Sequence, residues 1–160
     1  MRPADPRELL VQVQTSDDVP KIRSELMRLE ASSRHRSGRS LSLVVDRWGG
    51  TGWPWGWYLR DVPVGYYDLS IATPPADAEA VLVAAPNQAR IEPLLQGYVA
   101  RRFRLRVWWV QDWGAAGVRD WARWLVARRA WSPTATMDEF LYLRPDVARA
   151  LDGAGRTNAS

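Results

Sequence analysis

The chain has 160 residues, of which 46% are hydrophobic and 25% are charged, a composition typical of one globular domain with a single core. Its formal net charge is +4, and all but one of its 22 lysines and arginines are arginines. The absence of cysteine excludes disulfides and thiolate metal sites. The single histidine argues against a histidine-based metal site, and no apolar run approaches the ~20 residues of a membrane-spanning helix.

The first part of the chain predicts two strands with a helix between them. Apolar and polar residues alternate over 9–15, which favours a strand, and the more continuously apolar residues 41–46 favour a second, central strand. The helix begins after the acidic residues 17–18, which suit the positive end of a helix dipole, and we expect it to end before the polar run 32–40. Its apolar side chains form one stripe at spacings of three and four: Val19, Ile22, Leu26 and Leu29.

A glycine-rich turn at 49–52 leads to a short helix in which Pro54 occupies the first turn. The later elements are expected in this order: a strand at 64–69, a strand at 80–85, a short helix from residue 87 or 88 to 95, a long strand at 98–110, a helix at 117–131 and a strand at 139–144. In the helix 117–131, spacing predicts an inward face made by Val118, Trp121, Ala122 and Leu125.

Helices and strands alternate in this series, which predicts an α/β fold. We expect a three-layer sandwich with a mostly parallel sheet of five or six strands and helices on both faces. A single α/β domain should span residues 1–152, and the small polar residues 153–160 predict a disordered tail. Both ends are typical of linkers, so we expect the chain to be a domain of a longer protein.

The densest feature of the chain is the aromatic segment Trp53–Asp61, with the sequence WPWGWYLRD. An indole N–H needs a hydrogen-bond partner when it is buried, so several adjacent tryptophans favour a half-exposed surface that binds a flat, amphipathic ligand. The predicted ligand-binding residues are Asp46, Arg47, Trp53, Trp55, Trp57, Tyr58, Arg60 and Asp61. No catalytic residue, metal ligand or cofactor is predicted.

Two alternatives remain open. Asp46 ends a strand, where ligands of open α/β sheets bind, so Asp46 and Asp61 could form the carboxylate pair of a stand-alone carbohydrate-active enzyme. The interpretation that we favour is that both aspartates are caps or ion-pair partners of the adjacent arginines. The glycine-rich turn lacks the spacing of a dinucleotide-binding motif, and the chain has no nucleophile elbow.

The second alternative is an anionic ligand or nucleic acid bound by the basic strand Arg101–Arg106, with nearby tryptophans as stacking platforms. The arginines could instead lie over apolar neighbours and reach water. No RNP-like or helix-turn-helix motif is present, which disfavours nucleic acid as a partner.

Several segments resemble the C-terminal soluble domain of GT-C-type polytopic membrane glycosyltransferases. These enzymes are related to dolichyl-phosphate-mannose protein mannosyltransferases and include a flippase-activity-associated branch. The string Trp53–Asp61 is the most specific of the similar segments, and together they cover roughly residues 41–149. The others are Val64–Tyr67, Ala80–Asn87, Tyr98–Trp109 and Glu139–Asp146.

The resemblance implies an extracytoplasmic domain appended to a multi-spanning catalytic region that uses lipid-linked sugar donors. The catalytic acidic residues of such enzymes lie between membrane helices that this chain lacks, so the isolated domain should have no transferase activity. The implied partners are the transmembrane region of the parent protein and a glycan or lipid-linked sugar. The matched residues Trp53, Trp55, Trp57, Tyr58, Arg60 and Asp61 are carried over as a family motif and not as a catalytic set.

Overall fold

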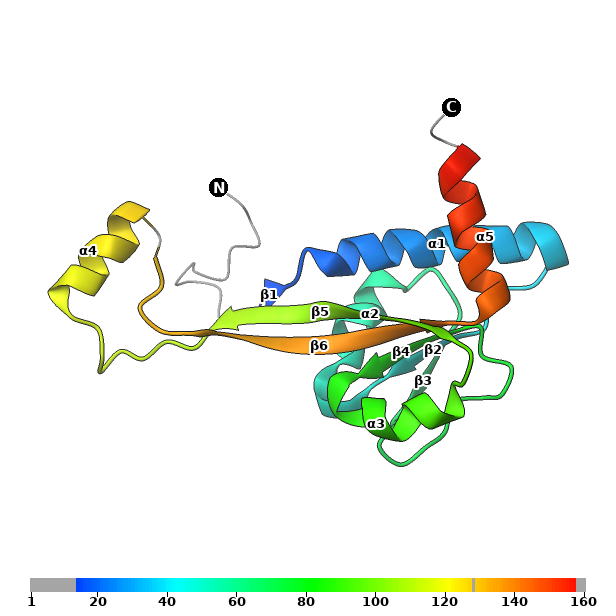
Figure 1. Cartoon of the computed structure of the whole chain (residues 1–160), viewed down its shortest axis with the longest axis horizontal. Helices are drawn as coiled ribbons and strands as arrows, with labels where there is room; N and C mark the ends of the chain where they lie inside the picture. The colour runs from blue at the N-terminus through cyan, green and yellow to red at the C-terminus, as the bar shows by residue number, and fades with distance from the viewer. Residues whose placement is uncertain (1–13, 128, 158–160) are drawn as a thin grey trace.

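One six-stranded sheet organises the computed structural model, which describes residues 14–127 and 129–157 (Figure 1). The strands are β1 (Gln14–Thr15), β2 (Leu43–Asp46), β3 (Val64–Tyr67), β4 (Ala80–Ala84), β5 (Val99–Trp109) and β6 (Thr134–Leu143). The helices are α1 (Asp18–Ser37), α2 (Gly52–Tyr58), α3 (Gln88–Ile91), α4 (Val118–Ala127) and α5 (Pro145–Thr157). Short 3-10 turns flank α2 and α3: η1 (Trp48–Gly50), η2 (Ala85–Asn87) and η3 (Glu92–Leu94).

The predicted mostly parallel three-layer sandwich is wrong. The strand order is β1-β5-β6-β4-β2-β3, and only the β2–β3 and β2–β4 pairs are parallel, whereas β1–β5, β5–β6 and β4–β6 are antiparallel. The sheet is therefore mixed, and it curls into a half-barrel. The long β5–β6 ladder contains a bulge between Arg104 and Arg106, which is the kind of irregularity that increases local twist.

The error arises from the connection between β5 and β6. A strand–helix–strand series gives parallel strands only when the helix packs back across the face of the sheet. Here α4 lies at the far end of the two strands, well away from the other helices (Figure 1). The chain therefore returns alongside itself as an antiparallel hairpin.

Helix α1 confirms the predicted apolar stripe but is longer than expected. Val19, Ile22, Leu26 and Leu29 are all buried. The polar run that was expected to end the helix continues it to Ser37, and Gly38 then ends it with φ +69°. Serine and arginine tolerate a helix interior, so only the glycine, which readily adopts the left-handed conformation, stops it.

The core is divided between the two faces of the sheet. The larger cluster joins the stripe of α1 to Trp55 of α2, to Leu59 directly after α2, to Val147 of α5 and to inward-facing strand residues. The smaller cluster lies on the opposite face and includes Ile91 of α3 and Tyr142 of β6. The last helix, α5, continues to Thr157, into the segment for which the sequence predicted a disordered tail, and residues 158–160 lie outside the described ranges.

The sheet and the helices α1, α2, α3 and α5 make up what we call the body. Residues 110–132 project from it at the end of β5 and β6 and form what we call the lobe, with α4 as its helix (Figure 1). Backbone pairing of the Val110 N–H with the Pro133 carbonyl closes its base, at 3.1 Å. The predicted inward face of α4 is wrong, because Val118, Ala122 and Leu125 are exposed and Trp124 is the buried residue of this helix. No sheet lies against α4, so its spacing alone did not identify the packed side.

Candidate functional site

The three tryptophans of α2 are separated by the geometry of the helix. Trp53 and Trp57 are four residues apart and therefore share one face, and they are 74% and 66% exposed. Trp55 lies on the other side of the helix and is fully buried. The segment predicted to face outward as a whole thus presents two indoles to solvent and buries the third.

Trp55 attaches α2 to the sheet. Its indole N–H donates a hydrogen bond of 2.7 Å to a carboxylate oxygen of Glu139 in β6, and its ring contacts the edge of Phe103, with centroids 6.0 Å apart. Both sets of contacts are buried, where an unmade hydrogen bond is costly. The exposed indole pair therefore stands on a helix that is anchored in the core.

Glu139 is a buried carboxyl group that was not among the predicted site residues. Burial raises the pKa of Glu139 to about 8, and the nearby Asp46 acts in the same direction against the hydrogen bond from Trp55. Its second oxygen, Oε1, has no hydrogen-bond partner among the described residues. Alternation along the strand places Glu139 on the face of Leu141 and Leu143, so the sequence did contain a signal for an inward-facing acid.

A cation borders the exposed indoles. The guanidinium of Arg60 lies over the Trp57 ring, 4.6 Å from its centroid, and forms a loose ion pair of 3.9 Å with Asp61. Tyr58 is partly buried against the core, and its backbone carbonyl accepts a hydrogen bond of 2.8 Å from Arg23 of α1. Planar apolar surface and polar groups therefore meet at this edge of the molecule.

Asp46 lies apart from this surface. It is fully buried, and its two oxygens accept hydrogen bonds from four donors: the backbone N–H groups of Trp48, Leu69 and Ala84 and the side-chain amide of Asn87. These bonds join the ends of β2 and β4 to the segments that follow β2 and β3. Its neighbour Arg47 is exposed, and the Arg47 N–H donates to the Tyr67 carbonyl at 2.9 Å.

The structure therefore brings together Trp53, Trp57, Arg60 and Asp61 at one surface, with Trp55 and Tyr58 beneath it. Asp46 is a structural acceptor whose carboxylate is saturated by protein donors. Asp61 is at the surface with its side chain 62% exposed. A buried saturated carboxylate and an exposed one do not form the facing pair that glycoside hydrolysis needs.

The basic strand is largely neutralised by acidic neighbours. Arg101 pairs with Glu25, Arg102 pairs with Asp138, and Arg104 lies 3.6 Å from Asp18. Arg106 donates to the Gly50 carbonyl at 3.0 Å. These contacts favour the reading in which the arginines cover the sheet rather than bind phosphates.

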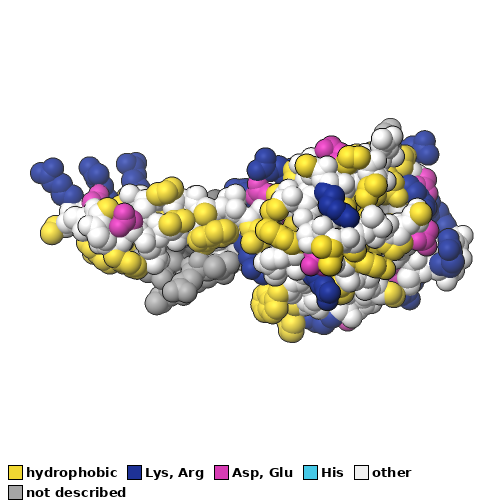
Figure 2. Space-filling view, turned by 90° about the horizontal axis from the view of Figure 1, so that it is seen from below, with side chains coloured by type: hydrophobic (Ala, Val, Ile, Leu, Met, Phe, Trp, Pro, Cys, Tyr) yellow, Lys and Arg dark blue, Asp and Glu magenta, His cyan; other side chains and the backbone are white. Residues whose placement is uncertain are grey.

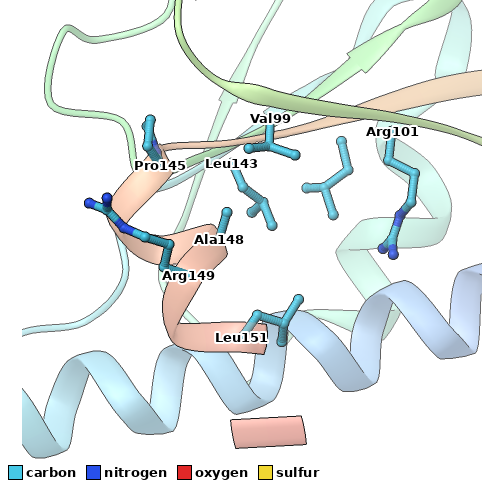
Figure 3. Close-up of a pocket in the computed structure, with 8 residues that line it drawn as sticks. Val99, Arg101, Leu143, Pro145, Ala148, Arg149 and Leu151 are labelled. Atoms are coloured by element: carbon cyan, nitrogen blue, oxygen red, sulfur yellow. The ribbon is translucent and has the colours of Figure 1, made fainter. Parts of the chain in front are cut away.

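A separate pocket of about 290 Å³ lies between β5, β6 and α5 (Figure 3). Its walls are mainly apolar, with Leu143, Ala148 and Leu151 toward the middle and Arg101 and Arg149 at its sides. No residue of α2 lines it. It is therefore distinct from the indole pair.

The described residues hold neither a metal-binding cluster nor a membrane-spanning helix. Within the part of the chain that the structure describes, no three histidine, aspartate or glutamate side chains gather closely enough to hold a metal ion. Over the same part of the chain, none of the helices combines the length and the apolar character needed to cross a bilayer. Comparison of the chain with protein-family models, curated proteins and solved structures found no match.

Proposed function

We propose that this chain is a non-catalytic, extracytoplasmic accessory domain of a membrane glycosyltransferase and that it binds a glycan through Trp53 and Trp57. The observation that supports it most directly is the pair of exposed indoles on one face of α2. The resemblance of Trp53–Asp61 to the soluble domains of GT-C-type enzymes supplies the context.

The chemistry of the surface suits a sugar. A pyranose ring has apolar faces made of C–H groups and a rim of hydroxyls, so it can lie on an indole while its rim bonds to charged groups. Arg60 and Asp61 stand beside Trp57 and supply a donor and an acceptor for such hydroxyls. Because Trp55 fixes α2 to the core, the platform is largely formed before a ligand arrives.

The absence of a catalytic role is supported by Asp46. Each of its carboxylate oxygens already accepts two hydrogen bonds, and these bonds connect strand ends. A group held in this way has no face available to a reacting sugar. We therefore expect that the isolated chain neither hydrolyses nor transfers activated sugars, and measurable turnover of aryl glycosides by the chain would contradict this part of the proposal.

Glycan binding can be tested by calorimetry with soluble oligosaccharides of mannose, glucose and N-acetylglucosamine. Trp53→Ala and Trp57→Ala should each weaken binding by roughly two- to tenfold, the magnitude expected for loss of one aromatic stacking contact. Trp113→Ala is the matched control, because Trp113 is also exposed but lies in the lobe. Absence of binding across the panel, or equal binding by the two α2 variants and the wild type, would overturn the proposal.

A further inference from the structure

The lobe contains a second exposed apolar surface, unrelated to α2. Val118, Ala122, Leu125 and Val126 follow one another at helical spacing and form one face of α4. All four are exposed, and Val126 and Leu125 are 88% and 63% exposed. A helix at the end of a hairpin that presents aliphatic side chains to solvent requires an explanation, because folding gains nothing from them there.

The neighbouring face of α4 packs on an indole cluster. Trp121 stacks on Trp113 with centroids 5.8 Å apart and contacts Trp131 at 5.0 Å, while Trp109 lies 4.4 Å from Trp131. Trp113 remains 54% exposed. The cluster holds α4 in place and leaves an indole at the border of the aliphatic face.

Arginines lie along one border of the aliphatic face. Arg119 and Arg123 follow the aliphatic face around α4, and Figure 2 shows basic side chains standing along one border of the lobe with hydrophobic side chains below them. A hollow of about 310 Å³ beside the helix is lined by Arg123, Arg129 and Trp131, and also by Asp120. Arg123 lies 3.9 Å from Asp120, whereas within the described residues neither Arg119 nor Arg129 forms an ion pair with a carboxylate.

An aliphatic face bordered by arginines on one side and by tryptophan on the other is a pattern of helices that lie in the interface of a lipid bilayer. A second copy of the chain fits this surface less well. The lobe segment 110–132 contains four arginines and two aspartates, so two such lobes would bring like charges together. An anionic surface instead complements them.

We infer that α4 and the adjoining indoles dock on an anionic lipid bilayer, with the aliphatic face in the headgroup–acyl boundary and the arginines among the lipid phosphates. The inference uses a different surface from the indole pair of α2 and does not rest on the proposed glycan binding. Co-sedimentation of the chain with vesicles tests it. The vesicles are equimolar phosphatidylglycerol and phosphatidylcholine in one arm and phosphatidylcholine alone in the other.

The wild-type chain should bind the anionic vesicles and bind phosphatidylcholine much more weakly, and added salt should weaken the anionic binding. The double variant Leu125→Glu/Val126→Glu should lose binding, because it places charge on the aliphatic face without disturbing a packed side chain. Leu94→Glu, at an exposed leucine 53% accessible in η3, is the matched control and should bind as the wild type does.

Replacing Arg119 and Arg123 by glutamine should lower the anionic partition by about fivefold for each arginine removed. Arg36→Gln/Arg39→Gln is the control, because it makes the same change in net charge. Arg36 is exposed in the last turn of α1 and Arg39 is exposed just after it, so this variant should have little effect on vesicle binding. Equal loss in both double variants would overturn the docking geometry, because net charge alone would then explain the binding.

Three results would overturn the inference: no sedimentation with anionic vesicles, equal sedimentation with both vesicle types, or unchanged binding by Leu125→Glu/Val126→Glu. A concentration-dependent dimer that this variant abolishes, with no vesicle binding, would assign the face to a second copy instead. Trp53→Ala/Trp57→Ala should bind vesicles normally, so failure of glycan binding and failure of bilayer docking are separable.

Discussion

At the scale of single residues, two buried carboxyl groups have opposite environments. Asp46 is surrounded by four donors, whereas Glu139 receives one hydrogen bond and has an oxygen without a partner among the described residues. A buried carboxylate is tolerated when donors replace its water and is penalised when they do not. Asp46 therefore joins strand ends as a hydrogen-bond acceptor, whereas burial raises the pKa of Glu139 and favours its neutral acid form.

This difference predicts how stability depends on pH. The pKa of Glu139 is raised to about 8 in the folded protein, mainly by burial, above its ordinary value of 4.5, so the folded state binds its proton more tightly than the unfolded state. The contribution is fully present below pH 4.5 and is lost as the pH rises through about 8. Each pH unit across this window costs up to about 1.4 kcal/mol from this group.

Glu139→Gln should therefore flatten the decline in the free energy of unfolding between pH 5 and pH 9, measured by urea denaturation, while the glutamine oxygen still accepts from Trp55. Glu92→Gln, on an exposed residue of η3, should leave the slope unchanged. An identical pH dependence in the wild type and Glu139→Gln would show that other groups govern it.

At the scale of elements, the seven residues of α2 both anchor the helix in the core and present two indoles to solvent. Trp55 and Leu59 pack into the larger core cluster, while Trp53 and Trp57 remain outside it. This short helix contains an interior glycine, Gly56, which is exposed. Apart from its chain neighbours and the backbone of its own helix, no atom lies within 4 Å of the position that a Cβ would take. The glycine is thus not required by packing or by a left-handed backbone.

Gly56→Ala should accordingly stabilise the protein by about 0.5–1 kcal/mol, because alanine loses less backbone freedom on forming a helix. Thermal unfolding should shift upward by roughly 2–4 °C for each kcal/mol gained. Gly49→Ala is the contrasting variant, since Gly49 has φ +57° and an alanine there should destabilise. A lower melting temperature for Gly56→Ala would mean that α2 needs its glycine for a reason outside helix propensity.

At the scale of the whole molecule, the sequence predicted most elements correctly but not how they assemble. The order of strands and helices, the stripe of α1 and the buried strand β4 follow from local periodicity. Strand direction depends on where a connecting helix packs, and local spacing in α4 could not show that it packs on indoles rather than on the sheet. Likewise, the many aromatic residues of Trp53–Asp61 correctly predicted an exposed surface for Trp53 and Trp57. Trp55 is buried because its position in the helix turns its side chain toward the core.

The lobe should be dispensable for folding of the body. None of the described residues of 110–132 belongs to either core cluster, and the base of the lobe is already closed by the Val110–Pro133 backbone hydrogen bond. Replacing residues 111–132 with a short Asn-Gly turn should leave the melting temperature of the body within a few degrees of the wild type. Glycan affinity should persist in this deletion. Loss of cooperative unfolding, measured by circular dichroism, would contradict the separation of lobe and body.

The strand β6 has one further consequence. It holds Glu139, the acceptor for the anchor of α2, and it continues without interruption to Thr134 beside the lobe. At roughly 3.3 Å per residue, a strand keeps its two ends at a set separation. If the indole pair of α2 binds a glycan while α4 lies on a bilayer, the length of β6 sets the distance between that glycan and the lipid phosphates.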